Sequence, residues 1–172
     1  MRREKNEKKF AIAILILGAV CAAPFFTGKI ILNTTPSVPI GLWLKDDSEI
    51  NRGDFVQVPF EAFKFNSWVP EIYKKKNSWG NIPYLKRIAG LPGDEVEILP
   101  DGLLKVAGKI IPGSFALSSD SLGNKLETYP LPITLESNEV WLISDSERGF
   151  DSRYLGPAVL SQCHKVLPLI TN

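Results

Sequence analysis

A charge-free apolar run near the N-terminus limits how this chain can fold. Residues 10–26, FAIAILILGAVCAAPFF, carry no charge and follow a leader, residues 1–9, with a net charge of +3. These 17 residues lie at the short end of the about 17 to 25 that a membrane-spanning helix needs, and basic flanks favour the cytoplasmic side. We therefore expect a leader at 1–9, one transmembrane anchor at 10–28 and a domain at 29–172 outside the membrane.

A cleavable signal peptide is the alternative interpretation of this run. It has the same basic leader and apolar core, and residues 19–21 or 21–23 resemble a small-residue cleavage site. A lipid anchor on Cys21 is disfavoured, because Val20 is too large just before such a cysteine.

Composition excludes several classes of function. The residues after the leader have a net charge of −2, so no basic face indicates nucleic-acid binding. His164 is the only histidine, and Cys163 is the only cysteine beyond the apolar run. A Ser-His-Asp triad, a disulfide within the domain and a four-ligand metal site are therefore poorly supplied. We expect no metal and no cofactor.

Short runs rich in Val and Ile, separated by Gly, Pro, Asn and Asp, predict an all-β domain. The predicted strands are 54–58, 84–89, 95–99, 103–106, 109–111 and 139–144, of which those within 95–111 form a meander. Two stretches interrupt this pattern. The first, at about 60–81, interleaves aromatic residues with lysines, which is typical either of a small subsidiary core or of contact with a bilayer or partner. The second, at about 118–138, is polar and predicted to be an exposed excursion.

Ser37 is a candidate nucleophile in a stiff segment. It lies between Pro36 and Pro39, and prolines restrict the backbone. A serine hydroxyl needs a base to take its proton. The amide of Ser37 and the hydroxyl of Thr35 are candidate donors to the oxyanion that forms when a carbonyl is attacked.

Lys86 is the candidate base. Alternation along a strand would place Tyr84, Lys86 and Ile88 on one face, where apolar neighbours would favour the neutral amine that a base requires. Taken alone, each residue has a plainer interpretation, with Ser37 in a linker and Lys86 in water. A third run, Asp151-Ser152-Arg153, taken alone predicts a structural ion pair.

Together these runs resemble the bacterial type I signal peptidase family S26. The matching segments are NTTPSVPIGLW at 33–43, KRIAGLPGD at 86–94 and FDSRYLGP at 150–157. Their order after a single apolar segment makes the joint match specific. The proline two residues after the serine and the following Gly-Leu-aromatic sequence are most similar to the conjugative transfer peptidases of the TraF type.

The resemblance implies roles for individual residues. Ser37 would be the nucleophile, Lys86 the general base and Thr35 an oxyanion donor, while Asp151, Ser152 and Arg153 would support the lysine and its loop. Many relatives have a serine at the position of Gly149, whose hydroxyl orients the lysine. In this chain we expect either Ser146 or Ser152 to compensate, or the lysine to be held differently.

The resemblance also implies a fold, a location and a function. It implies coiled, mostly antiparallel sheets behind one transmembrane helix, with the N-terminus in the cytoplasm and the catalytic domain on the periplasmic side of the inner membrane. The expected activity is a Ser-Lys endopeptidase that processes secreted precursors, matures a conjugative pilin by cleavage or cyclisation, and works with the conjugation machinery.

Two alternatives belong to other classes. The first is a catalytically weak, membrane-anchored assembly component of a conjugation or type IV secretion apparatus, motivated by Gly149 and the aromatic and lysine-rich stretch. The second is a self-cleaving repressor, which shares the Ser-Lys chemistry. It is disfavoured because no DNA-binding domain precedes Ser37.

Overall fold

The computed structural model describes positions 12, 14, 15 and 18 and residues 27–64, 76–77, 80–81 and 83–172. The predicted all-β domain is confirmed. Its main sheet has seven strands, and every neighbouring pair is antiparallel. In spatial order they are β1 (Ile30–Asn33), β2 (Gly41–Lys45), β13 (His164–Thr171), β3 (Phe55–Val58), β6 (Tyr84–Gly90), β11 (Glu139–Ile143) and β12 (Ala158–Val159).

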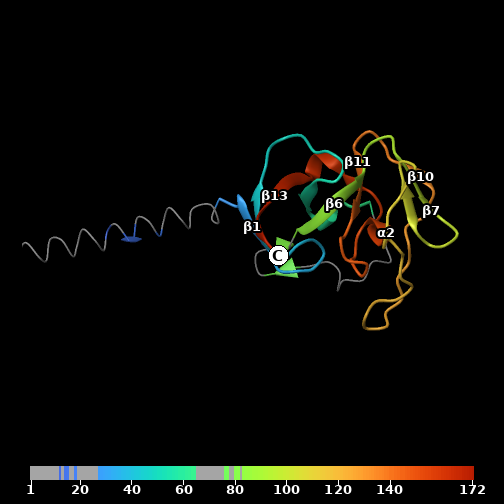
Figure 1. Cartoon of the computed structure of the whole chain (residues 1–172), viewed down its shortest axis with the longest axis horizontal. Coiled ribbons are helices and arrows are strands. Elements are labelled where there is room, and N and C mark those ends of the chain that lie inside the picture. Colours follow the sequence, from blue (N-terminus) through green and yellow to red (C-terminus); the bar gives the residue numbers. More distant parts are fainter. Residues whose placement is uncertain are drawn as a thin grey trace, which may run out of the picture.

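A four-stranded antiparallel sheet forms the other end of the domain, where Figure 1 shows β7 and β10 far from β1 and β13. Its order is β10 (Ile133–Thr134), β7 (Glu95–Ile98), β8 (Leu104–Val106) and β9 (Lys109–Ile110). The remaining described elements are the pair β4 (Lys76–Asn77) and β5 (Gly80–Asn81), the 3-10 turns η1 (Phe60–Ala62) and η3 (Leu160–Gln162), and the short helix α2 (Ser152–Leu155).

All six predicted strands and the meander are confirmed, with ends that differ by at most one residue. Strands β1, β2, β12 and β13 of the main sheet were not predicted, nor were the pair β4 and β5 or strand β10, which lies within the predicted excursion at 118–138. Strand β13 lies between β2 and β3 although it contains Pro168, and a proline normally argues against a central strand. A register shift between Pro168 and Ile170 lets the strand tolerate this residue.

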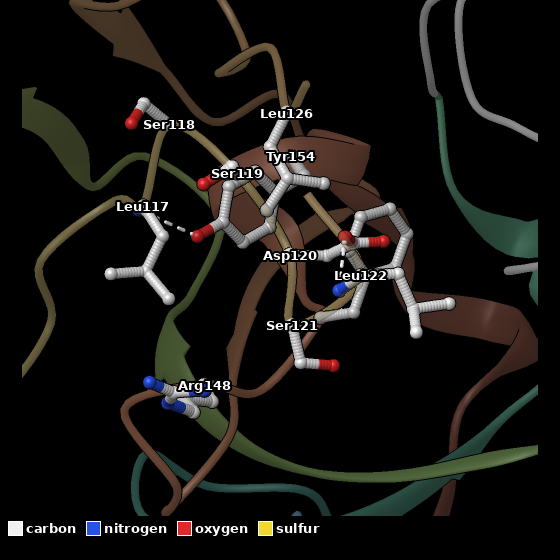
Figure 2. Close-up of a pocket in the computed structure, with 10 residues that line it drawn as sticks. Leu117, Ser118, Ser119, Asp120, Ser121, Leu122, Leu126, Arg148 and Tyr154 are labelled. Atoms are coloured by element: carbon white, nitrogen blue, oxygen red, sulfur yellow. Dashed lines mark hydrogen bonds between the residues drawn. The ribbon is translucent and has the colours of Figure 1, made fainter. Parts of the chain in front are cut away.

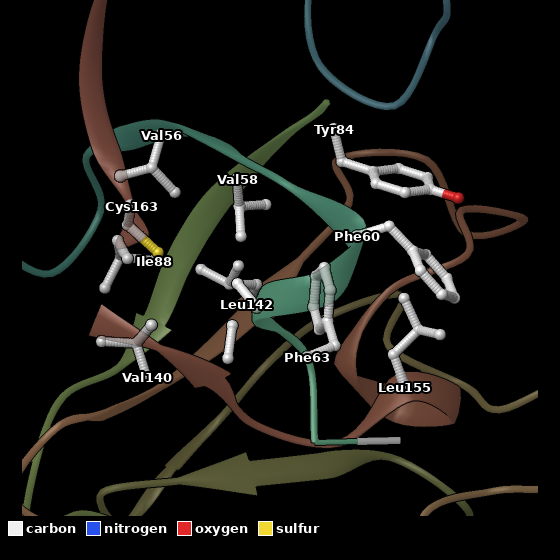
Figure 3. Packing of buried hydrophobic residues seen from close by; sticks show 12 residues of the cluster. Val56, Val58, Phe60, Phe63, Tyr84, Ile88, Val140, Leu142, Leu155 and Cys163 are labelled. Atoms are coloured by element: carbon white, nitrogen blue, oxygen red, sulfur yellow. The ribbon is translucent and has the colours of Figure 1, made fainter. Parts of the chain in front are cut away.

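The largest hydrophobic core lies between the main sheet and the segments that cover it. Aliphatic side chains of β3, β6 and β11 pack there, and Figure 3 shows the rings of Phe60, Phe63 and Tyr84 gathered at one end beside Leu155. Phe63 meets Tyr84 edge to face, with ring centroids 6.3 Å apart. The two phenylalanines begin the predicted aromatic stretch at 60–81, so at least its start closes the core.

The predicted anchor at 10–28 lies largely outside the described residues, as does much of the aromatic stretch. Within the described part of the chain, no helix has both the length and the apolar character that a membrane crossing requires. The predicted excursion at 118–138 is mostly exposed, and Leu126 and Leu135 are its buried side chains.

Candidate active site

Ser37 lies in the loop between β1 and β2, next to the strand that carries Lys86. Its Oγ donates to the backbone carbonyl of Leu85 at 3.4 Å and lies 3.1 Å from Thr35 Oγ1. Leu85 directly precedes Lys86 on β6, so the loop and the strand meet at the two predicted catalytic positions. A hydrogen bond of 3.4 Å is long for a hydroxyl donor, so this contact restrains the Ser37 hydroxyl only weakly.

Asn33 organises the loop around Ser37, a role that we did not predict. Its Nδ2 donates to the backbone carbonyls of Thr35, Val38 and Pro39 at 2.8, 3.1 and 3.0 Å. Its Oδ1 accepts from both the amide and the hydroxyl of Thr35, at 3.2 and 3.0 Å. Asparagine often organises turns in this way, so its position directly before Thr-Thr-Pro was the available signal.

The two predicted oxyanion donors differ in their resting state. Thr35 Oγ1 donates to Asn33 Oδ1, and a hydroxyl has only one proton to donate. The amide of Ser37 has no acceptor among the described residues. The Ser37 amide is therefore the open donor, whereas the Thr35 hydroxyl has to turn away from Asn33 before it can donate elsewhere.

Lys86 lies in an apolar environment on β6. Its side chain is only 2% exposed. Tyr84 and Ile88 belong to one core cluster, as alternation predicted, and Lys86 Nζ lies 5.4 Å from the centroid of the Tyr84 ring. Opposite Lys86 on β3 is the fully buried Val56. Lys86 therefore lies in the interior of the domain and not at its surface.

The neighbouring Arg87 has the opposite environment. Its side chain is 35% exposed, and its Nε and Nη2 donate to the two carboxylate oxygens of Asp145 at 2.8 and 2.7 Å. The guanidinium also lies 4.0 Å from the ring centroid of Phe55. Adjacent basic residues on β6 therefore divide into a solvated ion pair and a buried lysine.

The loop after β11 contacts the nucleophile segment, residues 33–41, at the carbonyl oxygen of Ser37. This oxygen accepts from the amide of Asp145 at 2.7 Å and from the hydroxyl of Ser144 at 2.9 Å. The amide of Ser144 in turn donates to Asp151 Oδ2 at 2.8 Å. A continuous set of hydrogen bonds therefore connects Asp151 to the backbone of Ser37.

The predicted ion pair between Asp151 and Arg153 is present and buried. Arg153 donates from Nε to Oδ1 and from Nη2 to Oδ2, both at 2.9 Å, and the two side chains are 0% and 2% exposed. Burial alone would lower the pKa of Arg153, but its bonds to the Asp151 carboxylate raise that pKa above its usual value. Arg153 also donates to the carbonyls of Phe115, Glu147 and Gly149, which fixes the loop around it.

Neither serine that we expected to compensate for Gly149 stands next to it as a replacement. Ser152 Oγ accepts from the amide of Leu142 at 2.9 Å, which ties α2 to β11. Ser146 contributes its backbone carbonyl, which accepts from the amide of Gly149 at 2.8 Å. The hydroxyl nearest to Gly149 is that of Ser144.

A small cavity of about 160 Å³ lies beside the Ser37 hydroxyl. Its walls come from β1, the nucleophile segment, β3 and the start of β6. The lining residues are Ile31, Leu32, Asn33, Thr34, Thr35, Ser37, Gln57, Pro83, Tyr84 and Leu85. A cavity of this size has room for a small side chain of a substrate.

A larger cavity, about 430 Å³, lies elsewhere. Leu117, Leu122, Arg148 and Tyr154 are among its lining residues, and none of the predicted catalytic residues is. Figure 2 shows the Tyr154 hydroxyl bonded to the backbone of Leu117, and Arg148 away from Leu126 on the other side of the view. Its size alone does not mark it as a reaction site, because it contains no paired nucleophile and base.

In the part of the chain that the structure describes, neither a cysteine nucleophile nor a metal site forms a competing centre. Burial raises the pKa of the Cys163 thiol to about 12, so this cysteine is a protonated core residue and not a nucleophile. Among the described residues, no group of three or more His, Cys, Asp or Glu side chains is arranged to hold a metal ion.

Comparison with known proteins decides the family. The family described as "Signal peptidase, peptidase S26" matches residues 5–165 of this chain. The chain belongs to the signal peptidase family S26. The "Plasmid transfer protein TraF" of Escherichia coli is 33% identical over 165 residues, which cover 92% of this chain and 90% of that protein. The "Conjugal transfer protein TraF" of Agrobacterium tumefaciens (strain 15955) is 28% identical over 163 residues, which cover 90% and 89%.

Among solved structures, a signal peptidase I from Enterococcus faecalis V583 is 22% identical, with a TM-score of 0.41 over 71% of this chain and 99% of that one. Membership of S26 confirms the resemblance predicted from the three motifs, including the similarity to TraF proteins. The peptidase class is therefore established at the level of the family.

Proposed function

We propose that this chain is a membrane-anchored serine endopeptidase in which Ser37 is the nucleophile and Lys86 the general base. The observation that carries the proposal is the contact between the Ser37 hydroxyl and the carbonyl of Leu85. This contact brings the hydroxyl to the residue directly before a lysine that is 2% exposed. A serine beside a buried lysine, at the edge of a small cavity, has the parts that acyl transfer needs.

The chemistry has two stages. Ser37 Oγ attacks the scissile carbonyl carbon while its proton passes to the neutral amine of Lys86. The resulting ammonium gives that proton to the leaving amine as the peptide bond breaks, which leaves an ester on Ser37. Lys86 then takes a proton from water as the water attacks the ester, and it returns that proton to Ser37 Oγ as the ester bond breaks, which releases the new carboxyl end and restores both residues. An amine of the same substrate in place of water would give a cyclic product.

Two donors would stabilise the oxyanion. The Ser37 amide has no acceptor among the described residues and is ready for the developing charge. Thr35 would contribute after its hydroxyl exchanges Asn33 Oδ1 for the oxyanion. We therefore assign the amide as the first donor and Thr35 as the second.

The substrates that we propose are secreted precursors with small residues near the scissile bond. A cavity of about 160 Å³ beside Ser37 suits a small side chain. The relatives that match most of the chain are named plasmid or conjugal transfer proteins, and in that context a pilin precursor is the best candidate. The charge-free run at 10–26 would hold the domain at the outer face of the cytoplasmic membrane, beside the conjugation machinery.

Processing of a precursor tests this function. The full chain in lipid vesicles is mixed with a conjugative pilin precursor, and products are followed by mass spectrometry. We expect Ser37→Ala and Lys86→Ala to abolish cleavage. Ser121→Ala, in the large cavity, and Lys105→Ala, in an exposed ion pair, are the matched controls and should cleave normally. Unchanged cleavage in both catalytic variants would reject the enzyme, and binding without cleavage by the unmodified chain would favour the assembly component.

The pH dependence tests the role of Lys86. If the neutral amine is the base, the rate rises with pH through the pKa of Lys86, because deprotonation creates the active form. A chemistry-limited rate that stays flat from about pH 6 to about pH 10 would contradict this role.

A further inference from the structure

We propose that Ser144 is a positioning residue for the nucleophile, and that its side chain occupies the space that a side chain at position 149 would need. The inference rests on the proposed function of Ser37. It adds a residue that the sequence motifs did not indicate, and it accounts for the glycine that departs from the pattern of many relatives.

Ser144 and Asp145 hold the same atom. The carbonyl oxygen of Ser37 accepts from the Asp145 amide at 2.7 Å and from the Ser144 hydroxyl at 2.9 Å. A carbonyl oxygen has two lone pairs, so these two donors satisfy it. With the carbonyl fixed on one side of the peptide, the direction of the Ser37 side chain on the other side is restricted.

Ser144 is itself fixed by the buried ion pair between Asp151 and Arg153. Its side chain is buried, and its amide donates to Asp151 Oδ2 at 2.8 Å. Asp151 is bonded in two places to Arg153, and both side chains are almost completely buried. The ion pair therefore restrains the position of Ser37 through Ser144, which bonds Asp151 by its amide and the Ser37 carbonyl by its hydroxyl.

The position of the Ser144 side chain also explains why residue 149 is a glycine. A Cβ at position 149 would overlap with the Cβ and Oγ of Ser144 and would lie 2.9 Å from the carbonyl oxygen of Ser146. Only one of positions 144 and 149 can therefore carry a side chain in this backbone. Glycine at 149 is the condition for serine at 144, not the loss of a functional group.

Ser144→Ala removes the hydroxyl and leaves the backbone bond to Asp151 intact, so we expect the variant to fold. With a peptide substrate that spans the cleavage site, kcat should fall about 10- to 100-fold, because a small displacement of a reacting group costs that much, while KM should stay unchanged. Ser146→Ala is the matched control in the same loop and should keep the original kcat. An unchanged kcat in Ser144→Ala, or an equal loss in Ser146→Ala, would overturn the positioning role.

Thermal unfolding tests the claim that only one of positions 144 and 149 can carry a side chain. Gly149→Ser should lower Tm, and Ser144→Gly combined with Gly149→Ser should recover most of that loss, because the overlap is gone. Ser144→Ala combined with Gly149→Ser should not recover it, since alanine keeps the clashing Cβ. Equal Tm values for Gly149→Ser and the unmodified chain would overturn the exclusion.

A spectroscopic measurement separates this inference from the proposed function. Ser37-Val38 is the only Ser-Val pair in the chain, so ¹³C-carbonyl serine with ¹⁵N-valine gives one correlated NMR signal. We expect the ¹³C signal of Ser37 to move upfield in Ser144→Ala and to stay in place in Ser146→Ala. This shift does not depend on turnover. If the signal moves but cleavage does not depend on Ser37, the proposed enzymatic function is rejected and the hydrogen bond from Ser144 to the Ser37 carbonyl is supported. If the signal does not move, the positioning role of Ser144 is rejected.

Discussion

The nucleophile segment, residues 33–41, and the support loop, residues 144–153, meet at the carbonyl of Ser37 but are held in different ways. The nucleophile segment is organised by one neutral side chain, that of Asn33, which donates to three backbone carbonyls. The support loop is organised by a buried ion pair between Asp151 and Arg153. The nucleophile segment therefore depends on several modest hydrogen bonds, whereas the support loop depends mainly on one buried charge pair.

Because the two regions are held in different ways, substitutions in them should have different effects on activity and on stability. A neutral side chain can be removed at the expense of its hydrogen bonds, each worth about 1 kcal/mol. One member of a buried ion pair cannot be removed without leaving an uncompensated charge, which costs about 3 to 5 kcal/mol. We therefore expect changes in the support loop to appear mainly as unfolding and changes in the nucleophile segment mainly as lost activity.

The largest effect is expected from Arg153→Met. The substitution leaves the Asp151 carboxylate buried without its partner, so the free energy of unfolding in urea should fall by about 3 to 5 kcal/mol. Arg87→Met is the matched control, because the Arg87–Asp145 pair is exposed and should contribute no more than about 1 kcal/mol. Equal losses in the two variants would show that burial of the pair does not matter.

The next effect is expected from Asn33→Ala. Three carbonyls lose a donor in a partly exposed segment, so the free energy of unfolding should fall by about 1 to 3 kcal/mol. Cleavage of the precursor should fall further than this instability explains, because Ser37 loses its fixed position. A variant that is less stable but cleaves at the original rate would show that Asn33 holds the fold and not the nucleophile.

Thr35 should affect activity with little change in stability. Thr35→Val keeps the shape of the side chain but removes its hydroxyl, and loss of one oxyanion donor lowers kcat by about 100-fold or more. Thr35→Ser keeps the hydroxyl and should retain most of the rate. Similar rates for the two variants would leave the Ser37 amide as the principal donor and reject a role for Thr35.

The smallest effect comes from the partly buried ion pair between Asp54 and Lys165, which lies outside both regions. Burial alone would raise the pKa of Asp54, but hydrogen bonds from Lys165 and from the Asn51 amide lower it below 3.8. The ionised pair therefore stabilises the fold at pH above 3.8, and this contribution is lost as pH falls through the lowered pKa. Asp54→Asn should remove at most about 1 kcal/mol, and should do so at neutral pH but not near pH 2. An equal loss at both pH values would contradict the assignment.

The strands and the motifs could be predicted from the sequence because they depend on local patterns. Alternation along β6 correctly predicted that Lys86 shares a face with Tyr84 and Ile88. Strand β13 was missed because Pro168 argues against a strand. Pro168 is tolerated where β13 pairs with β2 alone, since the pairing with β3 ends at Val166.

The contacts that assemble the site could not be predicted in the same way. The bond between the Ser144 hydroxyl and the Ser37 carbonyl joins residues 107 positions apart, and no spacing rule specifies such a pair. The same holds for Gly149, where the sequence shows a missing side chain but not the neighbour that fills the space. The role of Asn33 was accessible from its turn context and was overlooked.

The most direct test of the central claim is the intact mass of the full chain after mixing with a pilin precursor and quenching in acid. If Ser37 is the nucleophile, a covalent adduct should appear whose added mass is that of the precursor fragment on the amino-terminal side of the cleaved bond, less one water, linked as an ester to Ser37. The adduct should be absent in Ser37→Ala. Cleavage of the precursor by Ser37→Ala, or an ester located on another residue, would contradict the account.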